Sequence, residues 1–145
     1  MKPVLTHLAL GVRDLDRTID FYRRHAKLHV VHDRHDGHAR VVWLSERAEE
    51  PDFVLVLFQV DGEPPVAPST LQHLGFAVES RAEVEAAADA GRREGILVIP
   101  PTDAGPIVGY FCIVRDPDGN QVEFSHGQPI DPRHIDAARA SGSAL

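Results

Sequence analysis

The sequence HLALGV at residues 7–12 returns in nearly the same form as HLGFAV at residues 73–78. Each stretch begins with a histidine and then alternates small with large apolar residues. This alternation predicts a β-strand that carries the histidine and the small residues on one face and the large apolar residues on the other. The two histidines stand 66 residues apart, at positions 7 and 73. A repeat of this kind predicts an internal duplication.

The residues around the first stretch predict the order strand, helix and three strands. Asp14 or Asp16 is expected to cap the helix, because a side-chain oxygen at that place accepts a hydrogen bond from a free backbone N–H. Asp36-Gly37 is a strong hairpin signal between the second and third strands. The predicted elements are a strand at 5–12, a helix ending near 25, and strands at 28–33, 39–44 and 52–60.

The same order returns after a linker at about 62–69, which is rich in proline and lacks periodicity. Ser80 and Glu83 have the spacing of a capping box at the start of the second helix. A loop containing proline and glycine is expected at 100–106, and a short helix at 132–140 in the tail. The predicted elements are a strand at 71–78, a helix at 80–94, and strands at 96–99, 108–115 and 120–125.

These elements predict an α+β fold of two tandem βαβββ modules. The length of 145 residues fits one domain, with module one at about 4–61, module two at about 70–126 and a tail at 127–145. Each helix should cover the apolar face of its first strand. The opposite faces then carry histidines and small residues, which leave room for a pocket.

The composition argues against some classes of binding partner. The net charge is -7, and no basic cluster stands out, which argues against nucleic acid and anionic membranes. No apolar run is long enough to span a membrane, and no signal peptide is evident. The single cysteine, Cys112, is expected to be a buried thiol. A cytoplasmic protein that acts on or binds a small molecule is the expectation.

His7 and His73 occupy equivalent points of the two repeats, and Glu123 lies amid apolar residues in the last predicted strand. A single histidine at the start of a strand is usually structural, but these three residues lie in register on a duplicated frame. A buried carboxylate is costly without a counter-charge, which a metal ion would supply. The sequence therefore predicts that His7, His73 and Glu123 bind a divalent ion: Fe, Mn, Ni, Co or Zn.

Other polar residues near the site are less specific. His126 follows Glu123 by three residues and is expected at the pocket mouth; Glu123 and His126 are the predicted catalytic residues, and Glu79 is a further acid/base candidate. Arg115 either binds an anionic substrate or is a solvated or salt-bridged side chain. Asp116 is most simply a turn residue.

The chain resembles the vicinal oxygen chelate superfamily, also called the glyoxalase/bleomycin-resistance/dioxygenase superfamily. The features that carry the resemblance are His7, His73, the helix sequence at 14–22 and the segment DPDGNQVE at 116–123. The resemblance covers residues 4–126. It implies paired βαβββ modules that form a cupped mixed sheet around a divalent metal, a small substrate chelated through vicinal oxygens, and a homodimer.

Comparison with individual members leaves the reaction open. Glyoxalase I and methylmalonyl-CoA epimerase carry a fourth ligand where this chain has Val56 or Leu57. Extradiol dioxygenases carry a tyrosine where this chain has Ile113. Fosfomycin-resistance transferases carry a threonine where this chain has Ala9. The resemblance thus implies a dioxygenase-, lyase/isomerase- or thiol-transferase-like metalloenzyme, and the alternative is a metal-free small-molecule-binding protein of the bleomycin-binding type.

Overall fold

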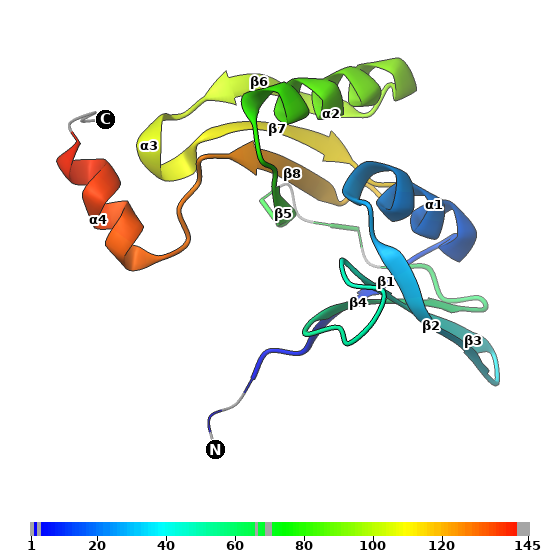
Figure 1. Ribbon diagram of the computed structural model, residues 1–145. Coiled ribbons are helices and arrows are strands. Elements are labelled where there is room, and N and C mark those ends of the chain that lie inside the picture. Colours follow the sequence, from blue (N-terminus) through cyan, green and yellow to red (C-terminus); the bar gives the residue numbers. More distant parts are fainter. Residues whose placement is uncertain (1, 3, 66, 69–70, 142–145) are drawn as a thin grey trace. The chain divides into compact units, whose positions relative to one another are not determined.

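The computed structural model describes residues 2, 4–65, 67–68 and 71–141. The chain divides into two compact units, Met1–Pro68 and Ser69–Leu145, and each contains its own four-stranded mixed sheet (Figure 1). None of the helices in these described residues is long and apolar enough to cross a membrane.

The first unit has the predicted βαβββ order. Its strands are hydrogen-bonded in the order β1-β4-β3-β2, and β1 runs parallel to β4 while the other neighbours are antiparallel. The elements are β1(His7–Gly11), α1(Leu15–Ala26), β2(His29–Asp36), β3(Ala39–Ser45) and β4(Val54–Val60).

The second unit repeats this topology, with strand order β5-β8-β7-β6 and β5 parallel to β8. The repeated order confirms the two tandem modules. The elements are β5(His73–Ala77), α2(Arg81–Glu94), β6(Leu97–Asp103), α3(Gly105–Val108), β7(Tyr110–Arg115), β8(Gln121–His126) and α4(Pro132–Ala140).

Local sequence explains where the helices begin and end. Of the two predicted caps for α1, the structure uses Asp14, whose carboxylate accepts from the Arg17 N–H at 3.0 Å. Ser80 caps α2, but the Glu83 carboxylate accepts from the N–H of Glu79 rather than of Ser80, so the capping box is displaced by one residue. Gly95 ends α2 with φ of 71°, a conformation that glycine adopts at no steric cost.

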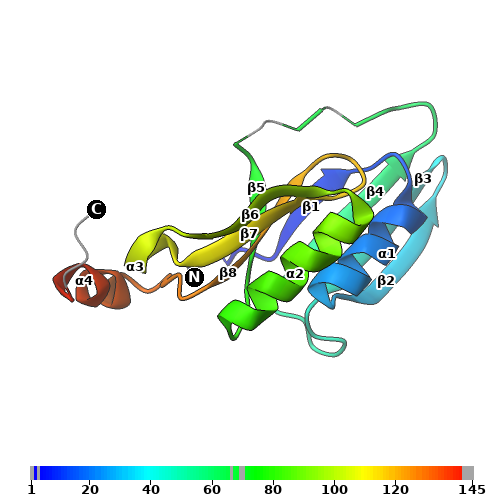
Figure 2. The same ribbon diagram turned by 90° about the horizontal axis from the view of Figure 1, so that it is seen from above.

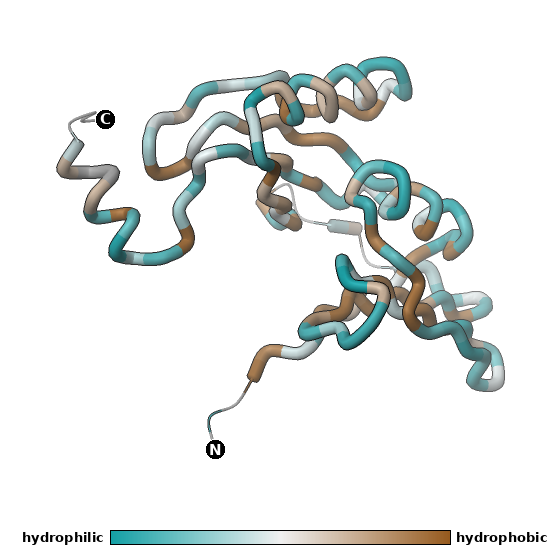
Figure 3. Tube along the Cα trace, in the orientation of Figure 1, coloured by the Kyte–Doolittle hydropathy of each residue, from teal (hydrophilic) through white to brown (hydrophobic). Residues whose placement is uncertain are grey.

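The helices α1 and α2 each cover the apolar face of their own sheet. In the second unit, Val84 and Ala88 of α2 are fully buried with Val114 and Val122 of the sheet. The register pairs Leu74 with Val122, so the large residues of β5 lie on the helix side as predicted. Figure 2 shows α1 and α2 each along its own sheet, and Figure 3 shows apolar residues concentrated along β4 and β7.

The predicted loop at 100–106 is wrong in its first half, because β6 continues through Pro100 and Pro101 to Asp103. A proline cannot donate a ladder hydrogen bond, but β6 is an edge strand with two register shifts, where that loss is tolerated. The short helix α3 was not predicted, and β7 begins at Tyr110 rather than at residue 108. The second strand is also longer than predicted, running to the hairpin at Asp36.

The turn before β8 is organised by one buried carboxylate. Asp116 is 4% exposed and accepts hydrogen bonds from the N–H groups of Asp118 and Asn120 and from the Asn120 amide, each at 2.9 Å. This pattern satisfies backbone donors that the turn leaves unpaired. Because the turn leads directly into Gln121, it sets where Glu123 lies along β8.

We expect Asp116→Ala to lower the free energy of unfolding by about 2–3 kcal/mol, since it removes three acceptor contacts worth about 1 kcal/mol each. Urea denaturation followed by circular dichroism measures this loss. Asp116→Asn keeps one carbonyl oxygen and should lose less. Equal stability of the alanine variant and the natural chain would contradict this role.

Candidate metal centre

His73 and Glu123 come together in the second unit. The parallel pairing of β5 with β8 sets His73 opposite Gln121 and Gly75 opposite Glu123, so both ionisable side chains lie on the sheet face away from α2. His73 Nε2 lies 3.8 Å from Glu123 Oε2. Two ligands bound at about 2.1 Å to a tetrahedral ion are about 3.4 Å apart, so this pair needs only a small side-chain rotation to share one ion.

The tautomer of His73 suits metal binding. Its Nδ1 lies 3.1 Å from the Leu71 carbonyl oxygen. A carbonyl oxygen only accepts, so Nδ1 carries a proton, and Nε2 is the ring nitrogen that faces Glu123. Metal-binding histidines commonly have this arrangement, in which a backbone carbonyl orients the ring.

Glu123 is 7% exposed, and His73 is its only ion-pair partner among the described residues of its unit. Its neighbour across β7 is the apolar Ile113. On the other side Gly75 leaves open space, since a Cβ built there would meet nothing within 4 Å. A carboxylate in this position has room beside it and little compensating charge, which fits a bound cation.

His7 holds the matching place in the first unit, at the start of β1. Its Nδ1 lies 3.0 Å from the hydroxyl of Thr6, a group that both donates and accepts, so this contact does not set the tautomer of the ring. In the second unit the structure brings two predicted ligands together, and the described residues hold no group of three or more such side chains. His7 belongs to the other unit, and its participation stays a prediction.

The register of the first unit identifies the counterpart of Glu123. His7 pairs with Val54 and Ala9 with Val56, as His73 pairs with Gln121 and Gly75 with Glu123. Val56, rather than Leu57, is therefore the equivalent residue. Valine has no atom that can bind a metal ion, so the first unit offers no fourth ligand at the position equivalent to Glu123.

His126 lies on the other face of β8. Residues alternate along a strand, and His126 is three positions from Glu123. Its Nδ1 donates to the Val78 carbonyl oxygen at 3.2 Å. A catalytic role for His126 stays a prediction, and this hydrogen bond supplies a structural role for the same side chain.

The face that carries His7 also carries an aromatic cluster, which we define as His32, Arg34 and Trp43. The His32 and Trp43 rings lie 4.8 Å apart, and the Arg34 guanidinium lies 5.8 Å from the Trp43 ring centre. Periodicity did not reveal the facing of His32, because the register of β2 shifts between Val30 and His32. Phe58 pairs with Gly11 on this face. In the second unit, Tyr110 donates its hydroxyl to Glu85 of α2.

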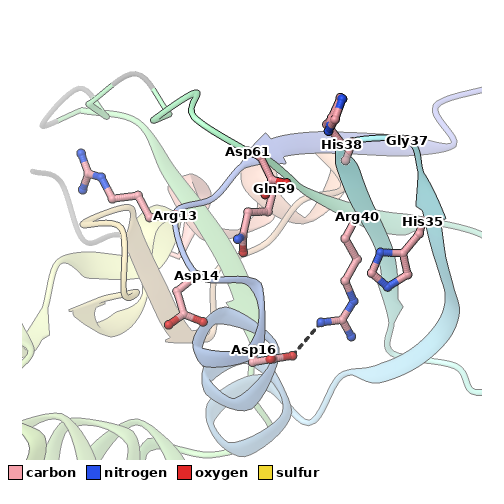
Figure 4. A pocket seen from close by; sticks show the side chains of 10 residues that line it. Arg13, Asp14, Asp16, His35, Gly37, His38, Arg40, Gln59 and Asp61 are labelled. Carbon is pink, nitrogen blue, oxygen red and sulfur yellow. Dashed lines mark hydrogen bonds and ion pairs between the residues drawn. The ribbon is translucent and has the colours of Figure 1, made fainter.

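A polar hollow of about 450 Å³ lies on the opposite side of the first sheet (Figure 4). Arg40 donates to Asp16 and to Asp33, both at 2.8 Å. These contacts raise the pKa of Arg40 and lower the pKa of Asp33. The charges of the hollow compensate one another, as in a structural network. Its lining residues are Arg13, Asp14, Asp16, His35, Gly37, His38, Ala39, Arg40, Gln59 and Asp61.

Comparison with known proteins agrees with this fold. The family model of the Glyoxalase/Bleomycin resistance protein/Dioxygenase superfamily matches residues 4–124. An uncharacterized protein of Pseudomonas aeruginosa is 42% identical over 132 residues, which are 91% of this chain and 94% of that protein. The chain therefore belongs to the glyoxalase/bleomycin resistance/dioxygenase superfamily.

Solved structures share the fold at low identity. The trypanothione-dependent glyoxalase I of Leishmania major matches with a TM-score of 0.73 and 21% identity, over 97% of this chain and 95% of that one. A fosfomycin resistance protein of Listeria monocytogenes, complexed with Mn(II) and 1S,2S-dihydroxypropylphosphonic acid, matches with a TM-score of 0.70 and 19% identity, over 92% and 98%. Proteins of this superfamily bind small-molecule substrates.

Proposed function

We propose that the chain is a divalent-metal-dependent enzyme that acts on a small substrate chelated through vicinal oxygens. The observation that carries the proposal is the pair formed by His73 Nε2 and Glu123 Oε2, 3.8 Å apart beside the open space at Gly75. His7 would supply the third ligand. The Mn(II) complex of the Listeria relative supports a metal in this superfamily.

When bound, the ion would polarise a substrate oxygen and stabilise an enolate or oxyanion. The residues of this chain do the rest. His73 and Glu123 would orient the site, with the Leu71 carbonyl oxygen holding the His73 ring in place. Gly75 and Ala77, on the same strand face, leave space for the substrate.

The proposal favours a three-ligand site, because Val56 stands at the fourth position. Dioxygenase-, lyase/isomerase- and thiol-transferase-like reactions are the candidate classes, and the identity of the metal would separate them. Iron would direct the search to oxygenation, nickel, cobalt or zinc to isomerisation, and manganese to thiol transfer. We also propose a homodimer located in the cytoplasm, in line with the resemblance and the acidic composition.

The test is elemental mass spectrometry on untagged protein purified without oxygen, followed by calorimetric titration with acetohydroxamate, a bidentate oxygen chelator. We expect near-stoichiometric metal and binding of the chelator that depends on this metal. A chain that carries no metal, and takes up none of Fe, Mn, Ni, Co or Zn on reconstitution, would overturn the proposal and favour the metal-free binding protein.

A further inference from the structure

The sheet face that carries His73 and Glu123 contains one fixed positive charge. In β7, Cys112 and Val114 are buried on the α2 side, with Cys112 Sγ 3.6 Å from the Val84 carbonyl oxygen. Phe111, Ile113 and Arg115 therefore lie on the opposite face. The register pairs Ile113 with Glu123 and Arg115 with Gln121, which places Arg115 on the face of the metal pair.

Arg115 and His73 belong to the same cross-strand row. Gln121 pairs with Arg115 on one side and with His73 on the other. Neighbouring strands are about 4.8 Å apart, so the Arg115 and His73 Cα atoms are separated by roughly two such spacings. An extended arginine side chain is long enough to span one such spacing, so the Arg115 guanidinium can reach across Gln121 towards the metal pair.

Nothing in its own unit neutralises Arg115. It makes no side-chain hydrogen bond or ion pair with the described residues of that unit, and it is exposed. The adjacent Asp116 already accepts three hydrogen bonds inside the turn. Most other arginines in the described residues are paired with an aspartate, among them Arg40, Arg81 and Arg133.

The fold itself does not require a cation at this place. The equivalent position in the first unit is Ser45, which is buried and donates its hydroxyl to the Phe53 carbonyl oxygen at 2.9 Å. The corresponding strand end of the first unit therefore forms without an arginine. Arg115 distinguishes the face of the second unit from that of the first.

We propose that Arg115 binds a carboxylate of the substrate and so selects small acids that carry vicinal chelating oxygens. This inference rests on the proposed metal centre. The oxygens would reach the ion at His73 and Glu123, while the guanidinium donates two parallel N–H···O bonds to the carboxylate. The buried Ile113 lies opposite Glu123 and next to Arg115 on the same face of β7, and it would contact the carbon chain of the acid.

The test compares three ligands on metal-loaded protein by calorimetry: acetohydroxamate and the monohydroxamates of malonic and succinic acid. All three present the same chelating group, and only the latter two add a carboxylate. We expect at least one of these acids to bind ten times or more tighter than acetohydroxamate. Arg115→Gln should abolish this preference without changing metal content or acetohydroxamate affinity, whereas Arg93→Gln, which changes an exposed residue of α2, should preserve it.

The experiment distinguishes a failure of the proposed Arg115 role from a failure of the proposed metal centre. If metal is bound but the acids bind no tighter than acetohydroxamate, or if Arg115→Gln keeps their advantage, the role of Arg115 is overturned and the metal centre stands. If the natural chain takes up no metal, both proposals fall. Arg115→Lys keeps the charge but loses the two parallel donors, so it should retain only part of the preference.

Discussion

His73→Ala is expected to abolish metal binding while the protein stays folded. The substitution removes Nε2, the donor that lies 3.8 Å from Glu123, and leaves a carboxylate without its partner in the unit. Loss of residues that merely orient ligands weakens metal affinity about 10–100-fold, so loss of a ligand should exceed the upper end of that range. Elemental mass spectrometry and competitive chelator titration measure the change.

The control is His29→Ala, because His29 is also an exposed strand histidine but begins β2. It should keep the metal content and affinity of the natural chain. Circular dichroism should show both variants folded, since the His73 side chain is 46% exposed and fills no core space. Metal affinity that is unchanged in His73→Ala would contradict the assignment of this residue.

The second large effect is expected from Gly109→Ala, at the junction of α3 and β7. Gly109 is buried, with φ of 83° and ψ of -163°, a conformation that is nearly exclusive to glycine. A Cβ there would lie 2.4 Å from the His126 carbonyl oxygen and 2.9 Å from the Gln128 nitrogen. Because both atoms are backbone, they cannot rotate away. We expect unfolding free energy to fall by about 3 kcal/mol or more.

Gly127→Ala provides the matched comparison. Gly127 also has a positive φ, of 79°, but a Cβ there meets nothing within 4 Å. Its loss should be limited to the cost of the left-handed conformation, about 1–2 kcal/mol. Urea denaturation of the two variants separates strain from steric clash. Equal losses would show that the backbone at Gly109 relaxes around the new methyl group.

Local sequence patterns were sufficient to predict most of the fold. The alternation at residues 7–12 and 73–78, the caps at Asp14 and Ser80, and the Asp36-Gly37 hairpin each depend on neighbours within a few residues. The structure confirms the helices and the order of the strands. Signals of this range are read directly from the sequence, because the hydrogen bonds and side-chain faces that they describe are local.

The features that the sequence patterns did not predict depend on pairing between strands that are distant in the sequence. The register of β1 with β4 identified Val56 as the counterpart of Glu123. The edge position of β6 allowed prolines to enter a strand, and the register shift in β2 brought His32 against Trp43. The tautomer of His73 depends on a carbonyl two residues before it, in an irregular segment.

The sequence of this protein was therefore sufficient for its duplicated αβ architecture, its superfamily and three candidate ligands. Only the folded chain decided that His73 and Glu123 face each other, that His126 lies on the other side of β8, and that Arg115 shares a row with His73. The physical reason is that alternation assigns a residue to one of two faces, whereas strand order and register determine which residues on a face become neighbours.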